Sequence, residues 1–127
     1  MAITTLTSAN FKQVIASNPF VIIDFWARWC EPCISFAEQF KPAAERHGDL
    51  LFAMLDIDQA PEVADYFNIK QIPCVLAIKD QIVIDGQIGD MTASAFDHLI
   101  AQWRNFDLTE INRHFDKKVT SLVASNT

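Results

Sequence analysis

The feature that most constrains the fold of this chain is an apolar run that leads, through a pair of cysteines, into a helical pattern. Residues 20–26 are almost all apolar, which is typical of a strand covered on both faces. Cys30 and Cys33 follow, and a helical pattern begins with them and continues to His47, before Gly48 ends it. Two thiols at this spacing can close a small reversible disulfide, and the positive end of a helix favours a thiolate. The sequence therefore predicts thiol–disulfide exchange at a strand-to-helix junction.

Strand and helix patterns alternate along the first 106 residues. The expected strands cover residues 3–6, 20–26, 51–57, 74–78 and 82–88, and the expected helices cover residues 8–17, 30–47, 61–67 and a segment capped near Thr92. This alternation predicts an α/β fold with a mostly parallel central sheet flanked by helices on both faces. A tight turn at residues 79–81 pairs the last two strands, so the sheet gains an antiparallel edge and is mixed.

Residues 107–127 carry a different pattern. Their apolar residues recur every three or four positions, at Leu108, Ile111, Phe115, Val119 and Leu122. Asp107 and Glu110 form a capping pair, so we expect an added C-terminal amphipathic helix. Its apolar stripe should pack on its own domain or mediate a weak dimer, because an exposed apolar patch is a liability for a lone monomer. The chain thus divides into a domain of residues 1–106 and a helical extension of residues 107–127.

Charge and composition argue against several classes of function. The net charge of −6, without any basic cluster, disfavours nucleic acid and an anionic membrane surface as partners. The longest apolar stretches are only strand-sized, and residues 1–5 have neither the charge nor the apolar run of a secretory signal. Three cysteines are too few, and odd in number, for a secreted scaffold held by disulfides. We therefore expect a protein of the reducing cytoplasm.

Four separate segments of the sequence resemble the thioredoxin family in order and spacing. They are residues 24–33 (DFWARWCEPC), residues 56–61 (DIDQAP), the dipeptide Ile72-Pro73, and Gly89. The resemblance covers roughly residues 3–106 and implies a thioredoxin fold. It also implies a thiol–disulfide oxidoreductase that reduces disulfides in client proteins, needs no cofactor of its own, and is re-reduced by a thioredoxin reductase or another thiol donor.

The two cysteines are expected to have different roles. Cys30 lies in the first turn of its helix, where unpaired N–H groups favour negative charge, so it should be the more acidic and more exposed thiol and the attacking nucleophile. Cys33 lies one turn further in and would resolve the mixed disulfide. Pro32 would stiffen the loop between the thiols. By the resemblance, Asp24 lies beneath Cys33 and acts as its general acid or base through a water.

The resemblance also implies a surface that binds clients. Ile72 and Pro73 look like the cis-proline segment that faces the thiol pair and presents the Ile72 backbone to an extended client strand. Together with Trp29 and Gly89, this segment would form a shallow apolar groove over Cys30.

Three residues depart from the family pattern. Glu31 stands where thioredoxins usually have glycine, and its carboxylate should disfavour a thiolate at Cys30 and alter the contact surface. Met54 stands where a lysine commonly pairs with the buried acid, so the pKa of Asp24 should rise further. Cys74 stands where threonine is usual, as a small buried apolar residue or as a third redox thiol.

Other interpretations of the same residues remain open. The cysteine pair can be structural, or it can be a redox switch in a thioredoxin-fold module that binds partner proteins. With Cys74, the pair would hold zinc or an iron–sulfur cluster only if a partner chain or a small thiol supplied a fourth ligand, and we expect no metal. Asp24 can equally be a structural polar group bonded to the backbone.

Overall fold

The apolar run of residues 20–26 forms the central strand of a five-stranded sheet. The computed structural model describes residues 3–108. Its strands are β1 (Ile3–Thr5), β2 (Phe20–Trp26), β3 (Leu51–Asp56), β4 (Cys74–Lys79) and β5 (Ile82–Ile88). Its helices are α1 (Phe11–Ser17), α2 (Glu31–Arg46), α3 (Pro61–Tyr66) and α4 (Ala93–Arg104). The predicted order of strands and helices is confirmed.

The sheet is mixed, with β2 at the junction between its parallel and antiparallel parts. The strand order is β1-β3-β2-β4-β5. β3 runs parallel to both β1 and β2, whereas β4 runs antiparallel to both β2 and β5. The predicted mixed sheet with an antiparallel edge is therefore confirmed.

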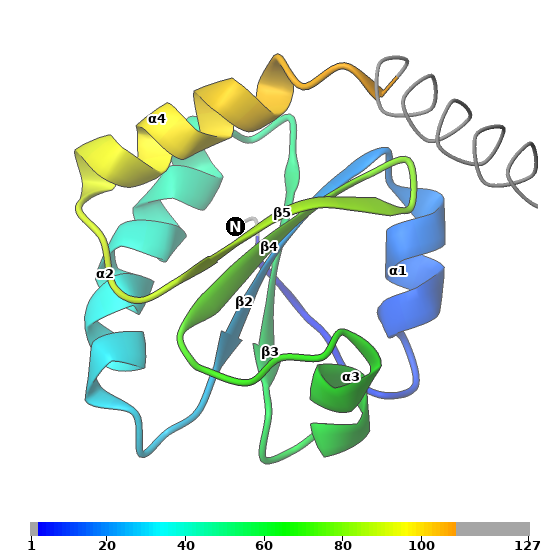
Figure 1. The fold of residues 1–127 in the computed structure, drawn as a ribbon, viewed down its shortest axis with the longest axis vertical. Coiled ribbons are helices and arrows are strands. Elements are labelled where there is room, and N and C mark those ends of the chain that lie inside the picture. The colour runs from blue at the N-terminus through cyan, green and yellow to red at the C-terminus, as the bar shows by residue number, and fades with distance from the viewer. Residues whose placement is uncertain (1–2, 109–127) are drawn as a thin grey trace, which may run out of the picture.

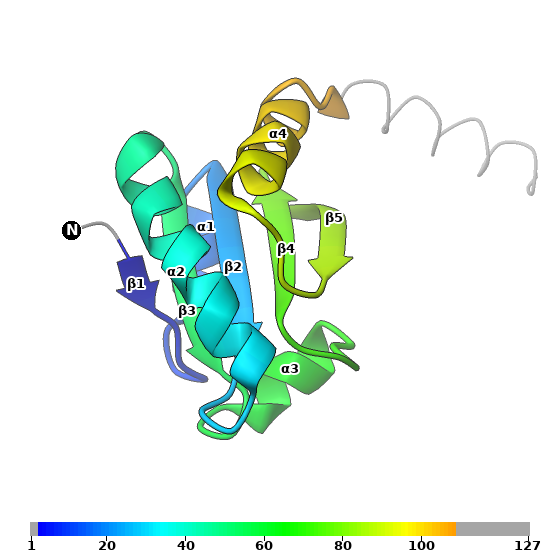
Figure 2. The same cartoon turned by 90° about the vertical axis from the view of Figure 1, so that its left-hand side faces the viewer.

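Helices α1 and α3 cover one face of the sheet, and α2 and α4 cover the other (Figures 1 and 2). Successive side chains of a strand point to opposite faces, and β2 shows this clearly. Val21, Ile23 and Phe25 belong to the core cluster that includes residues of α1 and α3. Phe20 and Ile22 belong to the cluster that includes residues of α2 and α4. β2 is thus apolar on both faces because both faces are covered.

The α2 helix has suitable residues at its N-terminal end and buried phenylalanines along its length. Cys30 is the N-cap, with Glu31 and Pro32 in the first turn, where an acid suits the helix dipole and a proline loses no hydrogen bond. Phe36 and Phe40, spaced by one turn, are fully buried and contact the ring of Phe96 on α4. Burial of each ring contributes about 1.5–3 kcal/mol, so this aromatic cluster holds the start of α2 in place.

The α1 helix begins later than the sequence pattern predicted. Helical geometry starts at Phe11 and not at Ser8. The Thr7 hydroxyl accepts the backbone N–H groups of Ala9 and Asn10, both at 3.2 Å. The Thr7 side chain thus holds residues 8–10 in a turn, and helical geometry begins only after it. Thr7, just before the expected start at residue 8, therefore organises the loop that leads into the helix.

The end of α4 is fixed to the hairpin of β4 and β5. The Lys79 Nζ donates to the backbone carbonyl oxygens of Arg104 at 3.0 Å and Phe106 at 3.1 Å. Trp103 donates its indole N–H to Asp85 of β5 at 2.8 Å. A lysine at the C-terminal end of a helix satisfies carbonyls that have no partner within the helix. These bonds determine where the chain leaves the domain.

The turn between β4 and β5 places two non-glycine residues in the left-handed region. Asp80 has φ 47° and Gln81 has φ 69°, as a two-residue type I′ hairpin requires. We expect Gln81→Gly to raise the free energy of unfolding by about 0.5 kcal/mol, because relief of left-handed strain outweighs the added chain entropy. Urea denaturation measures the change, and Gln87→Gly within β5 is the control that should destabilise. A loss of stability in Gln81→Gly would contradict this view of the turn.

The predicted C-terminal helix lies mostly outside the described residues, which end at Leu108. The division into residues 1–106 and 107–127 therefore stays a prediction. Within residues 3–108, no helix is long and apolar enough to cross a bilayer.

Candidate functional site

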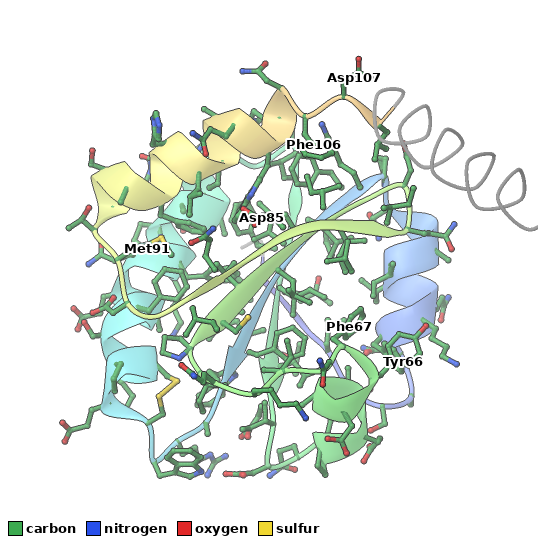
Figure 3. All side chains as sticks on the ribbon, in the orientation of Figure 1. Tyr66, Phe67, Asp85, Met91, Phe106 and Asp107 are labelled. Carbon is green, nitrogen blue, oxygen red and sulfur yellow. A yellow bond between two sulfur atoms is a disulfide. The ribbon has the colours of Figure 1, made fainter. Side chains whose placement is uncertain are left out.

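The two cysteines lie together at the start of α2, where the structure contains a Cys30–Cys33 disulfide (Figure 3). Their Cα atoms are 5.2 Å apart. Cys30 is the helix N-cap, just outside the first turn in which it was predicted, and Cys33 lies inside that turn. Cys30 is 5% exposed and Cys33 is 1% exposed. The order of exposure agrees with the expected roles, although both sulfurs are largely covered in this disulfide form.

A backbone donor of the helix points at the sulfur of Cys30. The N–H of Cys33 lies 3.2 Å from the Cys30 Sγ and donates to it. The first N–H groups of a helix have no partner inside the helix, and a hydrogen bond to an ionised acceptor is stronger than one to a neutral acceptor. The same N–H would therefore stabilise a thiolate at Cys30 after reduction. This geometry favours Cys30 over Cys33 as the site of a thiolate.

Asp24 is a fully buried acid near the middle of the sheet. Neither of its carboxyl oxygens has a hydrogen-bond partner among residues 3–108. Burial removes the carboxylate from water and raises the pKa of Asp24 from 3.8 to about 7. The structural alternative, in which backbone groups bond this carboxyl, therefore has no support in the geometry. An acid with a pKa near neutrality can both donate and accept a proton at physiological pH.

The neighbours of Asp24 explain its high pKa. Asp24 lies opposite Met54 on β3 and opposite Val75 on β4, so no cation stands at either position. Asp24 lies two residues after Ile22 on β2, so its side chain points to the same sheet face, which α2 covers. Trp26, two residues further along β2, packs against the cluster of Cys30 and Cys33. Asp24 therefore belongs to the face of the sheet on which the disulfide lies.

Cys74 is a buried free thiol on β4. Burial, and secondarily the charge of Asp24, raise the pKa of Cys74 to about 11, so this thiol is protonated at neutral pH. It packs in the core cluster on the α1 and α3 side, whereas Cys30 and Cys33 form a cluster of their own. Within the part of the chain that the structure describes, no three His, Cys, Asp or Glu side chains are grouped so that they could hold a metal ion. The geometry favours Cys74 as an apolar core residue.

The predicted client-binding segment faces the disulfide. The Ile72–Pro73 peptide bond is cis, and Ile72 packs against the cluster that contains Cys30 and Cys33. The N–H of Gly89 donates to the carbonyl oxygen of Pro73 at 2.8 Å. Gly89 has φ 101°, a conformation that favours glycine. These contacts bring residues 72–73, Gly89 and the thiol pair together.

Trp29 is a surface residue and not part of the core. It is 67% exposed, and its indole Nε1 donates to Asp58 Oδ2 at 2.9 Å. Asp58 lies in the loop after β3, and the sequence analysis gave it no role although it stands within the DIDQAP segment. The acid holds an exposed aromatic ring beside Cys30, which is the geometry of a contact surface.

Two further apolar side chains near the site were missed by the sequence analysis. Ile34, next to Cys33 on α2, and Ile88, next to Gly89 on β5, are both exposed. Glu31 is also exposed, so the surface around Cys30 combines apolar groups with one carboxylate. Only the spatial arrangement gives this signal, because in sequence each isoleucine looks like a residue of a buried helix or strand.

Comparison with known proteins gives consistent matches. The family model described as thioredoxin matches residues 2–102. A protein described as putative thioredoxin 2 from Streptomyces coelicolor is 38% identical over 108 residues, which is 85% of this chain and 81% of that protein. A thioredoxin from Alicyclobacillus acidocaldarius is 42% identical over 79 residues, which is 61% of this chain and 75% of that protein.

Solved structures show the same fold. A structure of Plasmodium falciparum thioredoxin has a TM-score of 0.73 and 30% identity, with 80% of this chain and 98% of that chain covered. A solution structure of the oxidised thioredoxin from the same organism also has a TM-score of 0.73, at 29% identity over the same shares of the two chains.

Proposed function

Because this chain belongs to the thioredoxin family of thiol–disulfide oxidoreductases, we propose that it reduces disulfide bonds in client proteins. The observation that carries the proposal is the hydrogen bond from the Cys33 N–H to the Cys30 Sγ, at the N-cap of α2. It provides a stabilised thiolate at Cys30, one residue from an exposed aromatic contact. A purely structural disulfide has no use for either feature.

The exchange proceeds in two steps. The Cys30 thiolate attacks one sulfur of the client disulfide, forms a mixed disulfide and releases the other client sulfur as a thiolate. Cys33 then loses its proton and attacks the Cys30 Sγ, which releases the second client sulfur. Two electrons pass from the dithiol to the client. The Cys30–Cys33 disulfide of the structure is the product state of the cycle.

Asp24 would handle the proton of Cys33 in the second step. Its carboxyl is buried on the sheet face of the disulfide and has a pKa of about 7, so it is partly ionised at neutral pH and can accept a proton. Since Asp24 lacks a direct hydrogen bond to any described residue, we propose that a water carries the proton between Cys33 and this carboxyl.

The client would bind across the surface formed by Trp29, Ile72 and Gly89. An extended client strand can pair with the backbone at Ile72, and the exposed ring of Trp29 can cover apolar client side chains. Pro32 stiffens the first turn of α2, between the two thiols. Glu31 adds a negative charge beside Cys30, which should disfavour clients that are acidic next to their disulfide.

The oxidised pair needs an electron donor before the next cycle. We propose a flavin-dependent thioredoxin reductase or another thiol donor, because Cys30–Cys33 must regain two electrons. For the same reason we expect the protein to work in the reducing cytoplasm.

Reduction of insulin by dithiothreitol tests the proposal. Catalysed precipitation of the insulin B chain supports it. The alternative is a thioredoxin-fold binding module whose thiol pair serves as a redox switch. An accessible Cys30–Cys33 pair that forms and breaks its disulfide without accelerating insulin reduction would favour this alternative.

The contact between Asp58 and Trp29 gives a prediction about client binding. We expect Asp58→Ala to raise the KM for insulin about threefold with little change in kcat, because the released indole must be ordered again when a client binds. Steady-state reduction kinetics measure both constants. Asp65→Ala, which removes an exposed aspartate from α3, is the matched control. An unchanged KM would show that the bond to Asp58 does not position Trp29 for clients.

A further inference from the structure

An apolar groove lies on the α1 and α3 side of the sheet, separate from the thiol pair. It has a volume of about 330 Å³. Its walls come from α1, from the end of α3, and from the hairpin of β4 and β5, and the lining residues are Phe11, Lys12, Ile15, Ala16, Tyr66, Phe67, Ile78, Gln81 and Val83. None of these residues has a role in the exchange of disulfides proposed above.

The groove leaves large apolar side chains in contact with water. Tyr66 is 63% exposed and Val83 is 47% exposed. The rings of Tyr66 and Phe67 stand edge-on to Phe11, and Figure 3 shows both side chains at the end of α3 that faces α1. The Lys12 Nζ lies 5.5 Å from the centre of the Tyr66 ring and is the only charged group of the lining. A surface of this composition is typical of a docking site for an apolar segment.

The described chain ends above the hairpin of β4 and β5, which forms one wall of this groove. The carbonyl oxygen of Phe106 accepts from Lys79, whose Nζ lies over the ring of Phe20 on the α2 and α4 face. Gln81, two residues after Lys79 in the same turn, lines the groove. Figures 1 and 3 show the segment that contains Phe106 and Asp107 above the hairpin, and Figure 2 shows its end on the β5 side of the sheet. Leu108 is already helical, so two extended residues and three helical ones place residue 111 at most about 11 Å from Phe106. The apolar stripe therefore begins near the hairpin wall of the groove.

The residues that follow carry an apolar stripe of suitable length. Ile111, Phe115, Val119 and Leu122 recur every three or four positions. As a helix, residues 108–122 would be about 21 Å long. The seven residues of α1, which form one wall of the groove, span about 10 Å by the same rise per residue. The segment can therefore cover the whole groove.

We propose that residues 109–122 dock in this groove of the same chain through their apolar stripe. The docked segment covers Tyr66 and Val83 and completes the α1 and α3 face of the domain. The inference is independent of the proposed disulfide reduction. The groove and the thiol-bearing helix α2 lie on opposite faces of the sheet (Figure 2), so the docked segment leaves Cys30 accessible to clients.

The test measures how well the segment protects a thiol placed in the groove. In the oxidised full-length protein, Cys30 and Cys33 are bonded and Cys74 is buried, so Val83→Cys supplies the reactive thiol. Its rate of alkylation by a maleimide is compared in two backgrounds, Phe115→Asp and the matched Asn112→Asp. Lys41→Cys, an exposed position on α2, reports any general change in reactivity.

Phe115→Asp should raise the alkylation rate of Val83→Cys about tenfold, because the docked state loses the burial of one phenyl ring. Asn112→Asp should leave the alkylation rate of Val83→Cys unchanged. In proteins that carry Lys41→Cys instead, neither Phe115→Asp nor Asn112→Asp should change the alkylation rate. Equal rates for Val83→Cys in the Phe115→Asp and Asn112→Asp backgrounds would overturn the proposal. Protection that grows with protein concentration, together with a dimer in sedimentation, would also overturn it, since the occupant would then come from a second copy.

Discussion

Replacing Cys30 with serine is expected to abolish disulfide reduction, with a rate at least about 1,000-fold lower than that of the wild type. A serine hydroxyl at the N-cap accepts the same N–H from Cys33, but it is not ionised at neutral pH and does not attack a disulfide. Insulin turnover with dithiothreitol as donor measures the loss. The fold should be unaffected, because serine is a good N-cap residue.

The partner variant, Cys33→Ser, should behave differently. It retains the attacking thiolate at Cys30 and lacks the resolving thiol, so it should accumulate a stable mixed disulfide with a client. Mass spectrometry of the trapped complex locates the bond. Cys74→Ala is the control and should keep nearly full activity, because this thiol is buried and protonated. Turnover by Cys30→Ser, or a complex trapped through Cys74, would contradict the assigned roles.

Asp24→Asn is expected to stabilise the oxidised protein at pH 8 by up to about 4 kcal/mol. The pKa of Asp24 rises from 3.8 to about 7 on folding, and each unit corresponds to about 1.4 kcal/mol. The folded state prefers the protonated carboxyl. The contribution of Asp24 to the free energy of unfolding is therefore highest below pH 4, decreases between pH 4 and pH 7, and stays low above pH 7. Asparagine has a similar shape and never ionises, so it avoids this loss.

Urea denaturation of both proteins at a series of pH values gives the difference in free energy of unfolding. That difference should be small near pH 4 and should grow toward pH 7, while the titration of other carboxyls largely cancels in the comparison. A difference that does not change with pH would show that Asp24 is not held as a neutral acid. In single-turnover experiments, the same substitution should slow release of the mixed disulfide about tenfold or more at pH 7.

Local patterns in the sequence were sufficient to predict most of the fold. The apolar run of residues 20–26 predicts a strand covered on both faces, and helices lie on both faces. Asn68 follows α3 with φ 58°, the left-handed conformation in which asparagine commonly ends a helix. The predicted start of the first helix, at residue 8, was wrong. Thr7 can cap a helix or close a turn, and spacing alone does not distinguish these two uses.

The site was predictable where it depends on neighbouring residues and less so where it depends on distant ones. Cys30 and Cys33 share one helical turn, so their pairing follows from spacing. The bond between Trp29 and Asp58 joins residues from two loops, and no local pattern encodes it. The pairing of Asp24 with Met54 on β3 was expected only from the resemblance to the thioredoxin family, because no local pattern encodes the register of two strands.

The antiparallel pairing of β4 with β2 brings together two parts of the candidate site that are far apart in the sequence. Phe25 pairs with Cys74, and this pairing places the start of β4 beside the end of β2, so residues 72–73 meet a cysteine more than 40 positions earlier in the sequence. The thiols themselves need only one turn of helix. Under the proposed function, the thiols can therefore oxidise and be reduced once one turn of helix exists, whereas client binding at residues 72–73 requires this long-range strand pair.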